Sequence, residues 1–206
     1  MLKLWGRINS INVQKVLWAL AELGVRYERV DAGLQFGVVN EPFYRKMNPN
    51  GRVPTIEDDG LVLWESNAIV RYLAARHGAG ALWPEDLRTR ADADRWMDWT
   101  ATTLGPAMTP VFWQLVRTPP EKRDPAALAA GTEQCAKLFG IFDGCLAGRE
   151  FVAGKTFTMG DIPVGTFVHR WYALPLERPA LANVEAYYAR LKRRPAYAEH
   201  VAKPLS

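Results

Sequence analysis

The chain has 206 residues, of which 49% are hydrophobic and 23% are charged, close to the averages for soluble globular proteins. This composition excludes a disordered chain, which lacks the apolar surface needed to offset the entropy of ordering. No stretch approaches about 18 uninterrupted apolar residues, so the sequence predicts no membrane-spanning helix. Residues 1–10 turn polar too early for a signal peptide, and we expect a cytoplasmic protein.

The net charge is +4, but the basic residues are scattered, and only LKRRP near the C-terminus forms a dense cluster. Solvated helix faces give the same pattern, so we expect no nucleic-acid partner. No metal-ligand spacing is found among the two cysteines and three histidines, which are Cys135, Cys145, His77, His169 and His200. We therefore predict no metal site and no resident cofactor.

The first part of the chain alternates strand-like and helix-like patterns. Residues 2–5 are a short apolar run that predicts a strand. Apolar residues then recur every three or four positions from Val13 to Leu23, which predicts a helix that Gly24 ends. Residues 27–31 predict a second strand, parallel to the first through a right-handed crossover.

A glycine-containing loop and a weak helical pattern come next. Two strands predicted over 55–58 and 61–64 then flank Asp59-Gly60, a pair typical of an antiparallel hairpin. A helix predicted over 66–76 follows. The predicted order is β-α-β-α-β-β-α, in which a parallel half joins an antiparallel hairpin.

Beyond this part the strand patterns vanish, and the sequence predicts helices punctuated by prolines at roughly 88–117, 125–146, 160–171, 181–193 and 195–201. We therefore predict an α/β domain over 1–78, a linker over 79–86 and an all-helical domain over 87–206. A cleft between two such domains is a common place for a ligand.

The Val53-Pro54 pair stands just before a predicted strand. If the Val53–Pro54 bond is cis, Val53 turns its own N–H and C=O outward, where an extended peptide could pair with them. Cis bonds are rare even before proline, so the residues alone favour a trans proline in a turn.

Glu65-Ser66-Asn67 opens the helix predicted over 66–76. Ser66 is suited to act as the N-cap of this helix. The same helix end, with its free N–H groups and positive dipole, also binds a carboxylate well, and Glu65 could hold an ammonium group. Together they match the backbone of a free amino acid. Both interpretations stay open.

Asn9-Ser10-Ile11-Asn12 lies between the first strand and the first helix. In one interpretation Ser10 or Asn12 caps the helix. In the other, a hydroxyl and several N–H groups point at one anionic atom, for which a substrate thiolate is the natural candidate because helix N-termini lower thiol pKa values. Position alone does not choose between them.

Residues 158–161, TMGD, precede an apolar helix and resemble a capping box with Asp in place of the usual Glu. We assign this segment a structural role and no chemistry.

Three separated motifs together resemble the glutathione transferase family, and the resemblance covers the whole chain. Residues 48–54, NPNGRVP, resemble the family's loop before its cis-proline. Residues 64–73, with WESNAI followed by YL, resemble its γ-glutamyl-binding signature. Residues 158–162 resemble the capping box in the buried helix of its C-terminal domain. The motifs occur in the family's order and at its spacings.

The resemblance implies a thioredoxin-like N-terminal domain, an all-α C-terminal domain, a homodimer and a glutathione site. It implies that the peptide bond before Pro54 is cis and that the Val53 backbone pairs with the cysteinyl part of glutathione. Glu65 and Ser66 then hold the γ-glutamyl end, with Arg52 adding charge nearby. The loop after the second strand does not match cleanly, so no residue is assigned to the glycyl carboxylate.

The chain departs from two branches of the family. Animal-type members often carry a catalytic Tyr after the first strand, thiol–disulfide enzymes often carry a Cys there, and this chain has neither. What remains is Ser10 with Asn12, similar to the Ser-type theta and zeta classes and to bacterial classes that use Thr or Ser followed by Asn. We predict a theta-like bacterial glutathione transferase in which one of these two residues activates the thiol. A glutathione-dependent disulfide reductase and a non-catalytic binding protein stay open as alternatives.

The second substrate is expected to be a small hydrophobic electrophile. Met108, Phe112 and Trp113 fall together on the long predicted helix, and Trp171 ends a later one. Eight tryptophans are a rich content for this length and suit an aromatic wall, although core packing would explain each residue equally.

The helix predicted over 88–117 carries apolar residues on more than one side, so one face could pack against a second copy of the chain. We therefore predict a homodimer.

Overall fold

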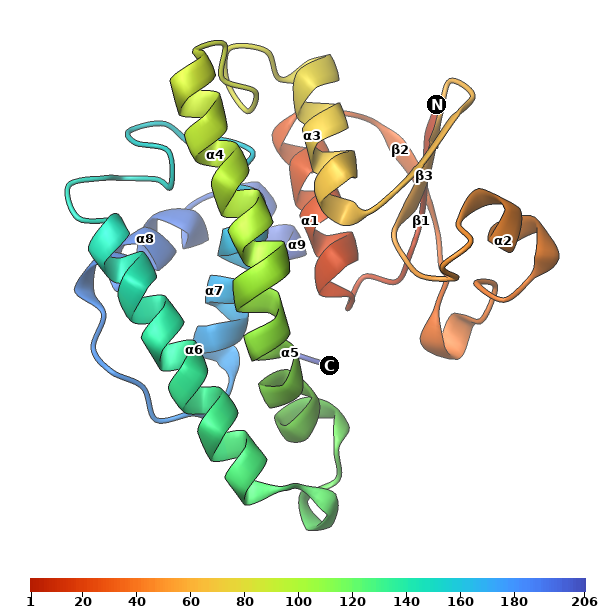
Figure 1. Cartoon of the computed structure of the whole chain (residues 1–206). Helices are drawn as coiled ribbons and strands as arrows, with labels where there is room; N and C mark the ends of the chain where they lie inside the picture. Colours follow the sequence, from red (N-terminus) through yellow and green to blue (C-terminus); the bar gives the residue numbers. More distant parts are fainter.

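The computed structural model describes residues 1–206 and contains a four-stranded sheet and nine α-helices (Figure 1). The strands are β1 (Leu2–Trp5), β2 (Tyr27–Val30), β3 (Thr55–Asp58) and β4 (Leu61–Trp64). The helices are α1 (Ile11–Glu22), α2 (Pro42–Met47), α3 (Ser66–His77), α4 (Leu87–Trp99), α5 (Gly105–Phe112), α6 (Pro125–Cys145), α7 (Asp161–Ala173), α8 (Ala182–Lys192) and α9 (Pro195–His200). None of them has the length and apolar content needed to cross a lipid bilayer.

The sheet has the strand order β2-β1-β3-β4, with β1 and β2 parallel and the other neighbours antiparallel. The β3–β4 hairpin turns at Asp59 and Gly60, whose φ angles are 48° and 83°. Tight hairpin turns require positive φ angles there, and an Asp-Gly pair adopts them at low cost. The predicted α/β order and the mixed sheet are confirmed.

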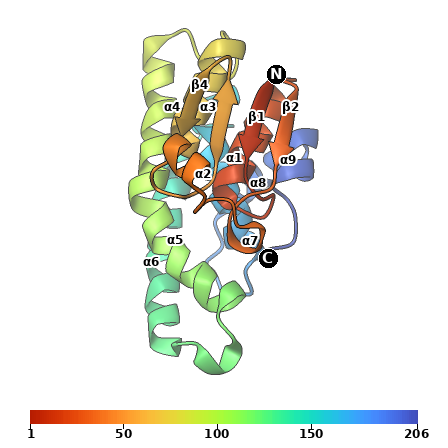
Figure 2. The ribbon, with the colours of Figure 1, turned by 90° about the vertical axis from the view of Figure 1, so that its right-hand side faces the viewer.

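Helices lie on both sides of the sheet (Figures 1 and 2). α1 and α3 stand between the sheet and the helical part of the chain. α2 covers the other face, where the ring of Trp5 on β1 lies 5.8 Å from that of Phe43 and 5.9 Å from that of Tyr44. Tyr44 is fully buried by this packing. It also anchors a loop of the site described below.

A hydrophobic core of 40 buried residues runs through both parts of the chain, and a second cluster of 3, namely Trp5, Ala32 and Tyr44, lies on the face of the sheet that α2 covers. Trp18 of α1 is fully buried, with its ring 4.7 Å from that of Tyr197 and 5.3 Å from that of Phe157. Gly165 of α7 permits this packing, because a Cβ atom there would lie 2.8 Å from Trp18. The connection between α3 and α4 falls where the sequence predicts a linker, over 79–86. The division into two domains stays a prediction, since their cores are continuous.

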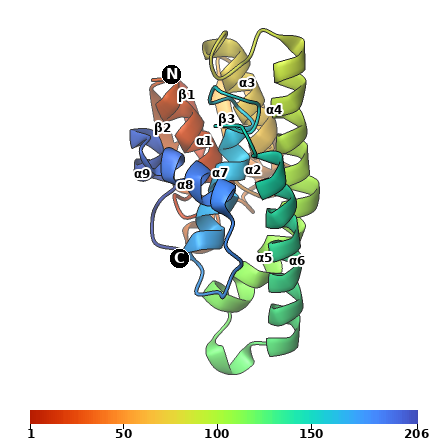
Figure 3. The ribbon, with the colours of Figure 1, turned by 90° about the vertical axis from the view of Figure 1, so that its left-hand side faces the viewer.

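The helix predicted over 88–117 is interrupted twice. α4 passes into a π-helical turn, Thr100–Leu104, and α5 passes into a second one, Trp113–Arg117. Pro106 and Pro110 lack an N–H and remove hydrogen bonds from the regular helical ladder, and helices kink or widen at such points. The resulting rod runs beside α6 (Figure 3). Its second wide turn lies at the cavity described below.

Most of the large apolar side chains of this rod are covered by the chain itself. Of the apolar side chains that the sequence places on different sides of this helix, Trp96, Met97, Leu104, Met108 and Val111 are at most 5% exposed, whereas Trp99 is only partly buried and Ala101 is exposed. The first five are buried because α6 and α7 pack against the rod. On its remaining side, Trp96 and Trp99 line a surface pocket with Ile141, which is 57% exposed, and the homodimer stays a prediction.

The start of α7 is held by a buried carboxylate rather than by a reciprocal cap. Asp161 is fully buried and accepts hydrogen bonds from the N–H of Thr158 (2.8 Å), the N–H of Val152 (2.9 Å) and the hydroxyl of Tyr187 (2.9 Å). The Thr158 hydroxyl donates to the same carboxylate at 3.3 Å. In the predicted capping box this hydroxyl accepts from an N–H, so the structure corrects the direction of that bond.

Candidate active site

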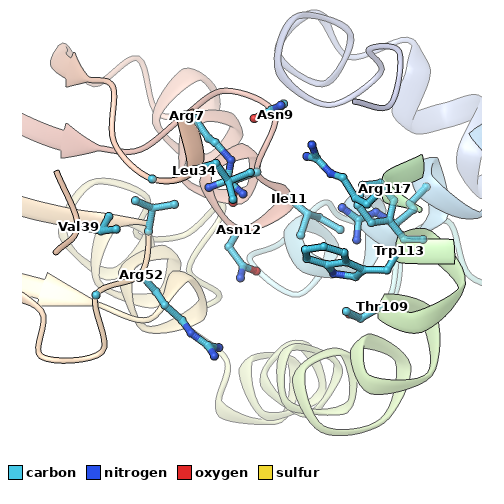
Figure 4. Close-up of a pocket in the computed structure, with 16 residues that line it drawn as sticks. Arg7, Asn9, Ile11, Asn12, Leu34, Val39, Arg52, Thr109, Trp113 and Arg117 are labelled. Atoms are coloured by element: carbon cyan, nitrogen blue, oxygen red, sulfur yellow. The ribbon is translucent and has the colours of Figure 1, made fainter. Parts of the chain in front are cut away.

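A cavity of about 500 Å³ lies between the sheet and the helical part, and no acidic residue lines it (Figure 4). Its wall is formed by the loop after β1 with the start of α1, the loops after β2 and before β3, the end of α5 with the turn that follows, and one residue of α7. The lining residues are Arg7, Asn9, Ser10, Ile11, Asn12, Gly33, Leu34, Val39, Gly51, Arg52, Val53, Thr109, Phe112, Trp113, Arg117 and Arg170. Six of the predicted site residues thus surround one space.

Ser10 is the N-cap of α1, and it is 8% exposed. A serine at this position normally accepts a hydrogen bond from an N–H of the first turn, but the Ser10 side chain makes no such bond. Its hydroxyl is therefore available to the cavity, beside the free N–H groups and the positive dipole end of α1.

The Asn12 side chain is held in one orientation by two donors. Its Oδ1 accepts hydrogen bonds from Nζ of Lys15 at 3.0 Å and from Oγ of Ser66 at 3.3 Å. An ammonium group donates and never accepts, so the Asn12 atom that faces Lys15 is the carbonyl oxygen. The NH₂ group of Asn12 is left for a ligand, and its oxygen ties α1 to the start of α3.

Lys15 is a cation buried behind Asn12. It is 4% exposed, and its Nζ lies 5.5 Å from the centroid of the Phe167 ring. Burial, with a smaller effect from the positive charge of Arg170, lowers the pKa of Lys15 to about 7, although the negative charge of Glu65 raises it. Lys15 is therefore poised between its charged and neutral forms near neutral pH.

Glu65, and not Ser66, is the N-cap of α3, which corrects the capping interpretation of Ser66. Glu65 has a φ angle of 72°, its side chain is exposed, and it makes no capping hydrogen bond. Such a conformation costs about 1–3 kcal/mol and is typical of functional sites. Ser66 is 6% exposed. Neither residue lines the cavity, but the bond from Ser66 to Asn12 joins the start of α3 to its wall.

The loop before β3 presents the Val53 backbone to the cavity. Asn48 and the buried Tyr44 hydroxyl both donate to the carbonyl of Arg52, at 2.9 and 2.7 Å, and so fix the loop. The Val53–Pro54 bond is cis, and no backbone hydrogen bond uses the N–H or C=O of Val53. These two groups are free to pair with an extended peptide. Arg52 is exposed at the cavity wall, whereas Pro54 is buried and does not line it.

Two of the four residues predicted to contact the second substrate line the cavity. They are Phe112 and Trp113, and Trp113 is 54% exposed with its ring directed into the cavity (Figure 4). Met108 and Trp171 are fully buried in the core, where Trp171 stacks on Phe139 with ring centroids 4.9 Å apart. The expectation for these two residues is corrected, because position along a helix does not fix which neighbours cover a side chain.

The sequence reasoning missed three arginines that line the cavity. Arg7, Arg117 and Arg170 come from three segments far apart in the chain. No motif contains them, and the only available signal was the excess of 26 basic over 22 acidic residues.

A mixed four-stranded sheet with a cis-proline before β3, joined to an all-helical part across a cavity, defines the glutathione transferase class of protein. Comparison with known families agrees. Residues 1–75 match the family described as glutathione S-transferase, N-terminal domain, and residues 125–190 match glutathione S-transferase, C-terminal domain. The chain belongs to the glutathione transferase family, which confirms the predicted family and fold.

Among known proteins, the chain is 44% identical to glutathione S-transferase GstB of Escherichia coli (strain K12) over 100% of both chains. It superposes on the theta class glutathione S-transferase of Xanthomonas axonopodis pv. citri, crystallised with glutathione bound, with a TM-score of 0.96, 48% identity and coverage of 100% and 99%. It also superposes on glutathione S-transferase I from maize in complex with an atrazine glutathione conjugate, with a TM-score of 0.87, 26% identity and coverage of 98% and 96%.

Proposed function

We propose that the chain catalyses attack of the glutathione thiolate on a hydrophobic electrophile, with Ser10 and Asn12 at the sulfur. The observation that carries this proposal is the Ser10 hydroxyl, which makes no capping bond at the start of α1 and borders the cavity. The hydroxyl, the Asn12 NH₂ group and the first N–H groups of α1 offer donors to one sulfur anion. The positive dipole end of the helix lowers the pKa of a thiol bound there.

Lys15 acts as a positioning residue in this proposal. Its hydrogen bond to Oδ1 of Asn12 leaves the NH₂ group of Asn12 directed toward a ligand. In its charged form Lys15 also adds to the positive potential around the sulfur, and little solvent screens it because it is buried.

Glutathione fits along the side of the cavity formed by the sheet domain. The N–H and C=O of Val53 pair with its cysteinyl part, as a strand adds to a sheet edge. Its γ-glutamyl end lies at the start of α3, where Ser66 and the free N–H groups take the carboxylate and Glu65 takes the ammonium group. Arg52 adds positive charge nearby. The Xanthomonas relative, crystallised with glutathione bound, supports the binding of glutathione itself.

Lowering the pKa of the glutathione thiol by itself increases the rate of attack only slightly. A free thiol with a pKa of about 8.5 is about 3% ionised at pH 7, and lowering that pKa by about two units makes it about three-quarters ionised. The thiolate fraction rises about 25-fold, but the less basic thiolate is about eightfold less nucleophilic, so the net gain in rate is only about threefold. The larger contribution comes from holding the thiolate against the electrophile, for which Phe112 and Trp113 supply an apolar wall.

The proposal extends to a detoxifying role, a cytoplasmic location, a homodimer and the two domains over 1–78 and 87–206. The homodimer is implied by the family resemblance. The domains follow from the change from strand to helix patterns after residue 78, and the two family matches fall on either side of the linker. Sedimentation equilibrium at micromolar concentration tests the homodimer, because a species of monomer mass would contradict it.

The test of function compares two reactions of the purified protein with glutathione. One uses a chloro-dinitrobenzene and the other a small mixed disulfide. Faster conjugation of the chloro-dinitrobenzene supports the transferase, whereas faster reduction of the disulfide would identify a reductase. Glutathione binding with neither reaction would indicate a binding protein.

A further inference from the structure

Positive charge gathers around the cavity. Four arginines line it, and no acidic residue does. Arg52 lies beside Val53, on the side assigned to glutathione. Arg7, Arg117 and Arg170 come from the β1–α1 loop and the helical part. In Figure 4, Arg52 and Arg117 lie on opposite sides of the space.

Arg170 is a buried cation that no anion balances. It is 7% exposed, its guanidinium lies 3.8 Å from the centroid of the Phe112 ring, and its Nε is buried without a hydrogen-bond partner. Burial, together with the positive charge of Arg117, lowers the pKa of Arg170 to about 9. An unpaired buried charge is strongly destabilising, so its presence in a cavity wall indicates that a ligand supplies the counter-charge.

Arg7 shows the same pattern from the other chain segment. Its Nε is also buried without a partner, and burial and the charge of Arg117 lower its pKa. Arg117 donates to the main-chain oxygen of Ser206 at 2.6 Å and lies 5.8 Å from the Phe112 ring. The charge of Arg117 thus acts on both Arg7 and Arg170, and an anion bound beside Arg117 would offset that repulsion.

We propose that Arg170, with Arg7 and Arg117, binds a carboxylate carried by the second substrate, which is therefore an anionic electrophile with an apolar body. This inference rests on the proposed function, because it names the class of electrophile that the same cavity accepts. Phe112 and Trp113 contact the apolar body. The carboxylate fixes which carbon of the electrophile faces the thiolate.

A chloronitrobenzoate is a suitable probe substrate. The glutathione sulfur forms a bond to the ring carbon that carries chlorine, the C–Cl bond breaks, and chloride leaves with the bonding electrons. The thiol proton passes to solvent. The carboxylate takes no part in these bond changes, so it contributes through binding alone. The matching chloronitrobenzamide keeps the ring, the leaving group and the shape but carries no charge.

The experiment measures kcat/KM for both probes in wild type and in Arg170→Met, which keeps an apolar stem against Phe112. The variant should lose about tenfold or more on the benzoate relative to the benzamide, with the KM for glutathione unchanged. Arg170→Lys should recover part of the loss. The matched control is Arg178→Met, because Nε of Arg178 is also buried without a partner, but Arg178 does not line the cavity.

Equal losses of kcat/KM for the benzoate and the benzamide in Arg170→Met would overturn the proposal. A higher KM for glutathione in this variant, measured with either probe, would also overturn it, because the arginines would then bind glutathione itself. If Arg170→Met does not fold, Arg7→Met and Arg117→Met replace it, and a loss on the benzoate no larger than that on the benzamide in both variants would overturn the proposal. If wild type conjugates neither probe nor a chloro-dinitrobenzene, the proposed function fails. Calorimetry with nitrobenzoate and nitrobenzamide on the glutathione-loaded protein then still tests the carboxylate site, since equal affinities would refute it.

Discussion

The two sides of the cavity are built by different means. The side assigned to glutathione combines backbone groups, namely the N–H and C=O of Val53 and the starts of α1 and α3, with side chains of the same short segments, such as Ser10 and Asn12. The opposite side consists of side chains, chiefly Trp113, Arg117 and Arg170, which reach the space from separate parts of the helical region. Backbone geometry is set by short local motifs, whereas the second side depends on how distant helices pack. A family can therefore keep one substrate and vary the other.

The largest expected effect on the glutathione side is at Ser10. Ser10→Ala should lower turnover at about pH 6.5 by about 100-fold, because it removes a donor that both stabilises the thiolate and holds the sulfur in position against the electrophile. The loss should be smaller at about pH 9, where the thiol ionises unaided. Absorbance titration of the bound thiolate measures the shift directly.

The control for Ser10→Ala is Thr102→Ala, because the Thr102 hydroxyl bonds only to the carbonyl of Asp98 on an exposed helix surface. An unchanged titration in Ser10→Ala with a shifted one in Asn12→Ala would move the activating role to Asn12. Ser10 would then be only a helix cap.

The next effect concerns Lys15, which connects the two sides. Its pKa is about 7 in the folded chain, against an ordinary value of 10.5. Between about pH 7 and pH 10.5 the unfolded chain keeps the Lys15 proton that the folded chain has lost, so the stability of the wild type rises with pH in this range. Below about pH 7 both states hold the proton, and the cost of burying the charged Lys15 is fully present. Lys15→Met should therefore be more stable than wild type by about 2 kcal/mol at about pH 6, and this advantage should shrink toward about pH 10. Its turnover should fall, because Asn12 loses its anchor.

Urea unfolding at the two pH values measures this difference, with the exposed Lys137→Met as the control. A stability gain in Lys15→Met that does not change with pH would show that Lys15 keeps an ordinary pKa in the folded chain.

Glu65 tests whether the strained start of α3 serves binding. Glu65→Ala should raise the Kd for glutathione about tenfold, because the ammonium group loses its charged partner. Glu65→Gly should weaken binding similarly but gain about 1 kcal/mol of stability relative to the alanine variant, because glycine adopts the φ angle of 72° without strain. Calorimetry and thermal unfolding measure the two effects. Glutathione affinity that is unchanged in both variants, as in the control Glu121→Ala, would exclude Glu65 from the site.

The smallest effect should come from Thr158, which belongs to neither side of the cavity. Thr158→Ala removes one of the hydrogen bonds to the buried carboxylate of Asp161 and should cost about 1 kcal/mol of stability. The melting temperature should fall while turnover per folded molecule stays normal. A stable but inactive variant would contradict the structural role of this segment.

The sequence allowed the glutathione side to be predicted better than the other. Strand and helix periods, the Asp59-Gly60 turn and the motifs over 48–54 and 64–73 are local patterns, and the predicted fold is confirmed. The N-cap of α3 was predicted one residue too late, at Ser66 instead of Glu65. The positive φ angle of Glu65 could not be predicted, because no local sequence pattern indicates it for a residue other than glycine.

The second side could not be predicted from local patterns. Met108 and Phe112 are one helical turn apart, yet only Phe112 lines the cavity. Which of them faces a ligand depends on the π-helical turn beside Phe112 and on the helices that cover the rod. Arg170 lies in an apolar helix, and its contact with Phe112 joins residues that are distant in sequence.

The packing of Trp18 against Gly165 constrains how the two parts of the chain can be recombined. A Cβ at position 165 would lie 2.8 Å from the indole ring, so the indole of one part requires a glycine in the other. Removal of the helical part would expose Trp18, and the two parts should unfold in one cooperative transition. A chimera that takes its first part from one relative and its second from another must therefore exchange both positions together. New electrophile specificity is more readily acquired through single side chains of the cavity wall than through exchange of a whole domain.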